Sequence, residues 1–214
     1  ILIRGQIAGA ICLGSTQPLH FYDGLRTDYL ERMAEKLGLG IDNILLLERL
    51  RRQPVLDKLT GLYNASYLDP VLEREFDRAK RYEKPLSTIK MWVDSSDDSD
   101  DTDNNSRQQK IFKEVGRILA DSSRGGDSVI RTGTNEFLML LPGLDKRAAV
   151  HVAERIRAAL ESFVFPDEDG VSLECRLGVS GYVPESMQLP SDLIHSATRA
   201  LSQARENGHH VVSV

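Results

Sequence analysis

The stretch SVIRTGTNEFLMLL, residues 128–141, decides the fold because two apolar runs flank a short polar tip. The runs 128–131 and 136–141 are rich in β-branched and large apolar residues, which predicts two strands. Among the four residues between them, the tip Gly133-Thr134-Asn135 suits a hairpin turn. We therefore expect a hairpin at the centre of this part of the chain.

Helices and strands alternate on both sides of this hairpin. Apolar residues recur at helical spacing in some segments, whereas short apolar runs predict strands in others. The expected helices are 67–82, 106–122, 145–162 and 191–207. The further strands are 86–93, 210–214 and the segment 171–183, which is either one long strand or a strand pair. Asp145 and Ser191 are the expected caps of the last two helices, and Gly208 is the expected stop. This alternation predicts an α/β fold in which helices cover a mixed sheet.

Residues 1–52 predict a second, smaller unit. Two short strands are expected within residues 1–13, and apolar spacing predicts a helix from about residue 27 to residue 52. Two short strands and one helix cannot enclose a core, so this unit needs further residues or a partner chain. Because the sequence opens within a strand, we expect it to be a fragment, with domains at 1–52 and 53–214.

The composition excludes several classes of protein. The formal net charge of −5 disfavours non-specific binding of nucleic acid, and no apolar run approaches the length of a membrane span. The two cysteines, Cys12 and Cys175, are far apart, which excludes a disulfide scaffold and a cysteine zinc site. We expect a cytoplasmic protein, or the cytoplasmic part of a membrane-anchored one.

Three motifs carry a resemblance to a known family. They are DKLTGLYN at 57–64, RTGTNEF at 131–137 and LSQARENGH at 201–209. In this order they resemble the D-x-L-T-G-L-x-N, R-x-G-G-D/E-E-F and L-Y-x-A-K-x-x-G-R motifs of GGDEF domains, the diguanylate cyclase family. Residues 1–52 are similar to the end of a GAF domain, with a G-x-I-x-G strand followed by a helix containing I-D-N. The resemblance implies a GGDEF-type, nucleotide-cyclase-like mixed sheet, preceded by part of a GAF α/β domain.

The resemblance also implies a site that joins two GTP molecules, with a glycine-rich hairpin at the phosphates and two acids on Mg²⁺. Asp94, Gly133, Glu136 and Phe137 keep the family pattern. Thr134 replaces a glycine and Asn135 replaces a metal-binding acid, and these are degenerate positions of the pattern. The lysine-bearing segment is also missing, so the expectation is a domain that is not an enzyme, without metal or cofactor.

Residues 94–103 hold six aspartates and no basic residue. Each of these carboxylates would repel the triphosphate of GTP by about 4 kcal/mol at a separation of about 4 Å. A Ca²⁺ loop is the alternative, but the glycine and distant glutamate of such loops are missing. A solvated loop is therefore favoured.

A second site of the family is kept. Arg124-Gly125-Gly126-Asp127 matches the R-x-x-D pattern at the spacing of the family's inhibitory site for cyclic di-GMP, and Arg155 and His151 fall on the following helix. Arginine can fork to guanine or phosphate, and the aspartate can accept from guanine N–H groups. R-x-x-D is a common string, but its position favours a ligand site. Two arginines and one aspartate predict a locally positive site.

The resemblance thus implies a catalytically inactive receptor of cyclic di-GMP that regulates an exopolysaccharide or biofilm type of output. One alternative is a weak diguanylate cyclase that uses Asp94, Glu136 and Arg205. The other is an interaction module without nucleotide, in which the helix within residues 24–52 contacts a second copy or a partner protein. No nucleic-acid partner is expected.

Overall fold

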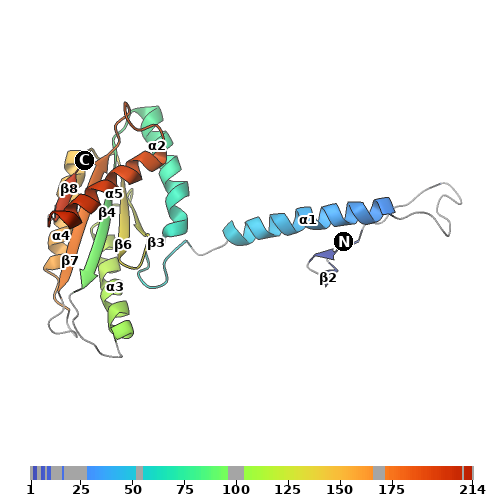
Figure 1. Ribbon diagram of the computed structural model, residues 1–214, viewed down its shortest axis with the longest axis horizontal. Helices are drawn as coiled ribbons and strands as arrows, with labels where there is room; N and C mark the ends of the chain where they lie inside the picture. Colours follow the sequence, from blue (N-terminus) through green and yellow to red (C-terminus); the bar gives the residue numbers. More distant parts are fainter. Residues whose placement is uncertain are drawn as a thin grey trace. The chain divides into compact units, whose positions relative to one another are not determined.

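The computed structural model describes residues 2–3, 6–7, 9–10, 16, 28–51, 55–95, 104–165, 172–208 and 210–213. The chain divides into two compact units, residues 1–54 and 55–214 (Figure 1). Among the helices in these ranges, none combines the length and the apolar character that a membrane crossing requires.

The first unit holds an antiparallel strand pair and one long helix. Strand β1 (Leu2–Ile3) pairs with β2 (Gln6–Ile7), and α1 spans Asp28–Arg51. The expected helix is therefore present over these 24 residues. How it continues toward the second unit lies outside the described residues, and the GAF assignment stays a prediction.

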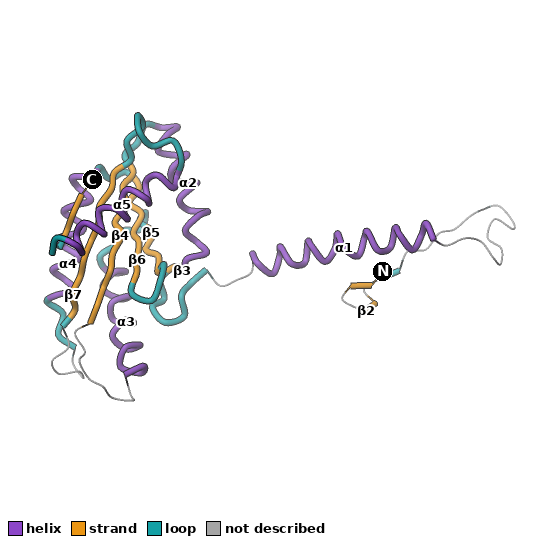
Figure 2. Tube along the Cα trace, viewed as in Figure 1, coloured by secondary structure: helices purple, strands orange, loops and turns teal. Residues whose placement is uncertain are grey.

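The second unit is built on a six-stranded mixed sheet with the order β3-β5-β6-β4-β7-β8 (Figure 2). The strands are β3 (Tyr63–Asn64), β4 (Leu86–Ser95), β5 (Ser128–Arg131), β6 (Glu136–Pro142), β7 (Leu173–Gly181) and β8 (Val211–Ser213). Strands β5 and β6 form the predicted hairpin, which pairs through β6 with β4. The predicted α/β fold with a mixed sheet is confirmed.

Helices cover both faces of this sheet. A short 3₁₀ turn at Ala65–Tyr67 leads into α2 (Leu68–Tyr82), and the other helices are α3 (Asn104–Asp121), α4 (Lys146–Glu161) and α5 (Pro190–Glu206). Alternate residues of each strand point to opposite faces. One set, including Ile89 and Met91, packs with α3 and α4, whereas Leu138 and Leu140 pack with α2 and α5.

Two local predictions differ from the structure. Helix α5 begins at Pro190 after Leu189, so Ser191 is not its cap. The side chain of Asp192 instead accepts from the backbone N–H groups of Gln188 and Leu189. The second difference is β3, a short strand that the sequence did not predict and that pairs in parallel with β5.

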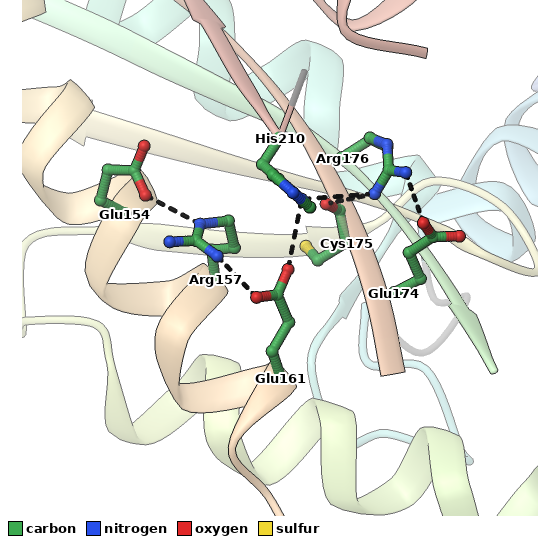
Figure 3. Close-up of polar contacts among 7 residues, drawn as sticks. All are labelled: Glu154, Arg157, Glu161, Glu174, Cys175, Arg176 and His210. Atoms are coloured by element: carbon green, nitrogen blue, oxygen red, sulfur yellow. Dashed lines mark hydrogen bonds and ion pairs between the residues drawn. The ribbon is translucent and has the colours of Figure 1, made fainter. Parts of the chain in front are cut away.

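A polar network joins α4, β7 and the start of β8 (Figure 3). Glu161 on α4 receives a hydrogen bond of 2.5 Å from Arg157, and its other carboxylate oxygen lies 3.5 Å from Nδ1 of His210. The same imidazole nitrogen lies 3.5 Å from Arg176 on β7. Beside this network, burial together with the charge of Glu161 raises the pKa of the Cys175 thiol to about 12. Cys175 is therefore a protonated core residue at neutral pH.

Helix α5 packs closely on the sheet at Gly178 of β7. A Cβ atom there would meet the backbone nitrogen of Leu201 at 2.2 Å and the carbonyl oxygen of Ala197 at 2.3 Å. Because backbone atoms cannot turn aside, we expect Gly178→Ala to lower the free energy of unfolding by about 3 kcal/mol. Urea unfolding followed by circular dichroism measures this.

Gly125→Ala is the matched control, because nothing lies within 4 Å of its added Cβ. Its free energy of unfolding should stay within about 0.5 kcal/mol of the parent value. Equal stability of the two variants would contradict this account of the packing.

Candidate functional site

One carboxylate joins the DKLTGLYN turn to the hairpin. Oδ1 of Asp57 accepts hydrogen bonds from the backbone N–H and the hydroxyl of Thr60, at 2.9 and 2.7 Å. It also accepts from Nη1 of Arg131, the last residue of β5, at 3.1 Å. Arg131 in turn donates to the carbonyl oxygens of Gly133 and Thr134, at 3.1 and 2.9 Å. Arg131, itself bound to Asp57, therefore holds the tip of the hairpin through its carbonyl oxygens.

These bonds change the acidity of Asp57. Burial alone would raise its pKa, but the hydrogen bonds from Thr60 and the adjacent guanidinium of Arg131 outweigh burial and hold the pKa below its ordinary value. The ionised carboxylate is thus the form that the folded structure stabilises.

The hairpin brings three of the candidate residues together at the end of β4. We call Asp94, Asn135 and Glu136 the hairpin edge. Nδ2 of Asn135 lies 3.5 Å from Oδ1 of Asp94, and the backbone N–H of Val93 donates to the carbonyl oxygen of Asn135. Phe137 points elsewhere, into the core between the sheet and α3.

The charges of the hairpin edge are partly paired. Oε2 of Glu136 lies 2.6 Å from Nζ of Lys90, whose side chain is only 13% exposed. Asp94 also accepts from the backbone N–H of Ser95. The exposed carboxylate of Asp94 and the amide oxygen of Asn135 are the groups here that could face a divalent cation. Within the ranges that the structure describes, no group of three or more His, Cys, Asp or Glu side chains is placed to hold a metal ion.

Of the acidic segment 94–103 that was expected to repel nucleotide, residues 96–103 lie outside the described residues. The same holds for His209, which stands at the family's arginine position. Arg205 is described, and its guanidinium carbon lies 4.3 Å from the centre of the Trp92 ring. Sequence reasoning did not anticipate this contact, because it joins residues more than 100 positions apart and depends on how α5 packs on β4.

The R-x-x-D pattern forms a tight turn between α3 and β5. The backbone N–H of Asp127 donates to the carbonyl oxygen of Arg124 at 2.9 Å, and Oδ2 of Asp127 accepts from the backbone N–H of Arg124 at 3.0 Å. The same oxygen lies 3.6 Å from Nε of Arg124. The Asp127 side chain is 4% exposed, whereas that of Arg124 is 58% exposed. Asp127 therefore fixes the turn, and Arg124 is the group that faces solvent.

Arg124, Asp127, His151 and Arg155 line one groove of about 650 Å³, which we call the Arg124 groove. Arg155 reaches it from α4, and its Nη2 donates to the carbonyl oxygen of Ser122 at 2.9 Å. The structure therefore brings four of the six predicted ligand residues together. Gly125 and Gly126 lie in the turn but are not among the residues lining the groove, and Gly126 borders a separate hollow beside α2.

The charge of the Arg124 groove differs from the expectation. Asp121 and Asp145 also line it, so three carboxylates stand against two guanidinium groups. Two of these carboxylates are engaged with backbone N–H groups: Asp127 with Arg124, and Asp145 with Ala148 as the cap of α4. The prediction that positive charges outnumber negative ones in this groove is therefore wrong. Arg124 and Arg155 are both exposed, so a ligand would meet these two side chains first.

Comparisons with known proteins agree with this fold. The family described as "Diguanylate cyclase, GGDEF domain" matches residues 55–210. Diguanylate cyclase DosC of Escherichia coli strain K12 is 28% identical over 170 residues, covering 79% of this chain and 37% of DosC. Diguanylate cyclase A of Treponema denticola is 24% identical over 216 residues, covering 99% of this chain and 57% of the relative. The chain thus spans less than two thirds of either relative.

A solved structure has the same fold. The GGDEF domain of DgcB from Caulobacter crescentus, in complex with c-di-GMP, matches with a TM-score of 0.67 at 19% identity, covering 76% of this chain and 96% of that chain.

The relatives correct one expectation. Because both are named diguanylate cyclases, the prediction that this chain is not an enzyme is contradicted. That prediction rested on the replacements at Thr134 and Asn135 and on the missing lysine-bearing segment. In the structure the Thr134 carbonyl accepts from Arg131, so the replaced tip keeps an ordered hairpin.

The bonds of Asp57 predict a pH-dependent stability. Since its pKa is lower in the folded chain than in the unfolded chain, its contribution is complete above about pH 4 and is lost as the pH falls through the lowered value. Asp57→Ala should therefore lower the free energy of unfolding at pH 7 by about 1.5–3 kcal/mol, and by less at pH 3.

Urea unfolding at pH 7, 5 and 3 measures this, with Asp77→Ala as the control at an exposed position of α2. An Asp57→Ala deficit that stays the same from pH 7 to pH 3 would show that the carboxylate does not act through its charge.

Proposed function

The chain belongs to the GGDEF domain family over residues 55–210, and from this premise we propose that it binds cyclic di-GMP in the Arg124 groove. The observation that carries the proposal is the meeting of two exposed arginines, Arg124 from the turn before β5 and Arg155 from α4, around one groove. Guanidinium groups fork to phosphate oxygens or to guanine O6 and N7. The DgcB domain of the same fold was solved in complex with c-di-GMP, which supports the choice of ligand.

The four predicted polar residues of the groove have different roles in this proposal. Arg124 and Arg155 contact the ligand, and binding redirects Arg155 from the Ser122 carbonyl oxygen that it contacts now. Asp127 holds the turn through the backbone N–H of Arg124, so its first role is to orient Arg124. His151, exposed one turn before Arg155 on α4, borders the groove and adds a further donor or acceptor.

Ligand binding would report the level of cyclic di-GMP to an output of the exopolysaccharide or biofilm type. Helix α1 is our candidate for contact with a second copy or a partner protein, because Leu37 and Leu39 on it are 43% and 68% exposed in the structure. Sedimentation velocity with and without cyclic di-GMP would show whether the chain self-associates.

Calorimetric titration with cyclic di-GMP tests the binding proposal. Arg124→Ala and Arg155→Ala should each weaken binding about tenfold or more, because a hydrogen bond to a charged group contributes about 1.5–3 kcal/mol. Asp127→Asn keeps an acceptor for the Arg124 N–H and should bind more tightly than Asp127→Ala.

Arg147→Ala is the matched control, since Arg147 is exposed on α4 and is not among the residues lining the groove. No binding by the parent chain, or unchanged affinity in both Arg124→Ala and Arg155→Ala, would refute the proposal.

A second candidate function is diguanylate cyclase activity, favoured by the names of the relatives. In this reaction the 3′-hydroxyl of each of two GTP molecules attacks the α-phosphate of the other, which forms two phosphodiester bonds and releases two pyrophosphates. Asp94 and Asn135 would face the divalent cation, and Arg205 would face phosphate. The acid that the family carries at position 135 is here an amide, so metal binding should limit the rate.

Chromatographic detection of cyclic di-GMP from GTP with Mg²⁺ or Mn²⁺ tests this activity. We expect slow formation that is lost in Asp94→Ala and increased in Asn135→Asp, because a second carboxylate strengthens cation binding. Product formation that is identical in the parent and Asp94→Ala would indicate a contaminating enzyme, and no product from the parent or Asn135→Asp would reject the second candidate.

A further inference from the structure

Trp92 is the only tryptophan of the chain, and it lies half-buried near the end of β4. It stands directly opposite Glu136 on β6 and Arg176 on β7. Side chains directly opposite one another in antiparallel strands share a face of the sheet. The indole therefore lies in one row with Glu136, next to the hairpin edge.

The charged neighbours of Trp92 in this row are already paired. Glu136 lies 2.6 Å from Nζ of Lys90, and Arg176 forms an ion pair with Glu174. Neither Glu136 nor Arg176 is therefore free to pair with another charged group that lies over the Trp92 ring.

The charged group over the Trp92 ring is the guanidinium of Arg205. Arg205 lies in the last turn of α5, and its guanidinium carbon lies over the Trp92 ring at 4.3 Å from the centre. Within the described part of the chain its guanidinium makes no hydrogen bond or ion pair, so its N–H donors are uncommitted. A guanidinium over an aromatic face can keep its N–H groups directed outward from the ring, where they can meet a ligand.

We propose that Trp92 is a positioning residue that holds the Arg205 guanidinium beside the hairpin edge, ready to bind the phosphates of a nucleoside triphosphate. The proposal rests on the second candidate function, because it assigns GTP to this edge. It is independent of the Arg124 groove, which lies at the opposite end of β5.

The physical reason is preorganisation. A free arginine loses rotamer freedom when it binds a ligand, and a ring that already holds it in place removes much of that loss. Cation–π attraction is weak enough at an exposed site for the guanidinium to shift toward phosphate. The ring would therefore keep Arg205 in position before binding and still allow its guanidinium to move toward the phosphate.

Four variants separate this role from simple packing. Trp92→Leu removes the aromatic face, Trp92→Phe keeps one, and Arg205→Gln removes the cation. Arg199→Gln is the control, since Arg199 is exposed on the same helix and carries the same charge. Circular dichroism and thermal unfolding show first that each variant is folded.

Calorimetric titration then uses two probes, GTP with Mg²⁺ and inorganic triphosphate with Mg²⁺. Trp92→Leu and Arg205→Gln should each weaken both probes about three- to tenfold, whereas Trp92→Phe and Arg199→Gln should stay within about twofold of the parent. Equal losses for the two probes assign the effect to phosphate, and a loss for GTP alone would overturn the proposal in favour of stacking on the base.

Fluorescence of the single tryptophan gives an independent readout. Binding of either probe should change the emission of Trp92 in the parent and leave it unchanged in Arg205→Gln, because only the parent has a cation to draw from the ring. Cyclic di-GMP bound in the Arg124 groove should not produce this change.

The possible failures are distinguishable. If the parent binds GTP but folded Trp92→Leu binds it equally well, the positioning role is wrong and the second candidate function stands. If the parent binds neither probe, both are wrong, while binding of cyclic di-GMP in the Arg124 groove remains a separate measurement.

Discussion

The second unit depends on the hydrogen bonds of a single carboxylate, that of Asp57. It accepts from Thr60 within its own turn and from Arg131 at the end of β5. Through Arg131 it also fixes the carbonyl oxygens of the hairpin tip. The start of the domain and its hairpin, 74 residues apart in sequence, are thus joined directly, and the hairpin edge is built on this junction.

The two candidate sites lie at opposite ends of the same strand. The turn of Arg124 and Asp127 leads into β5, and the hairpin edge follows its end. Four residues of strand span only about 13 Å, and both ends are fixed by backbone pairing with β6. A ligand in the Arg124 groove and one at the hairpin edge would therefore bind to a common rigid support without touching the same side chains.

Pairing among charged side chains decides which of them can meet a ligand. Lys90 forms an ion pair with Glu136, and Glu174 forms one with Arg176. The side chain of Asp127 accepts a hydrogen bond from the backbone N–H of Arg124. A count of charges in the sequence treats all of these groups as equal. In the folded chain the guanidinium of Arg124 remains 58% exposed although its Nε lies 3.6 Å from Asp127, and that of Arg205 lies over the Trp92 ring.

The sequence alone determined the α/β class, the hairpin and the motif residues, because apolar periodicity and turn chemistry are local properties. It placed Asp127 before β5 and Arg155 on the next helix for the same reason. Only the tertiary structure decided that Asp121 and Asp145 join the Arg124 groove and that Asp127 bonds to the Arg124 backbone. Likewise, Arg205 meets Trp92 because α5 crosses β4, a contact between residues more than 100 positions apart. Such contacts depend on how elements pack, and no local pattern in the sequence records that packing.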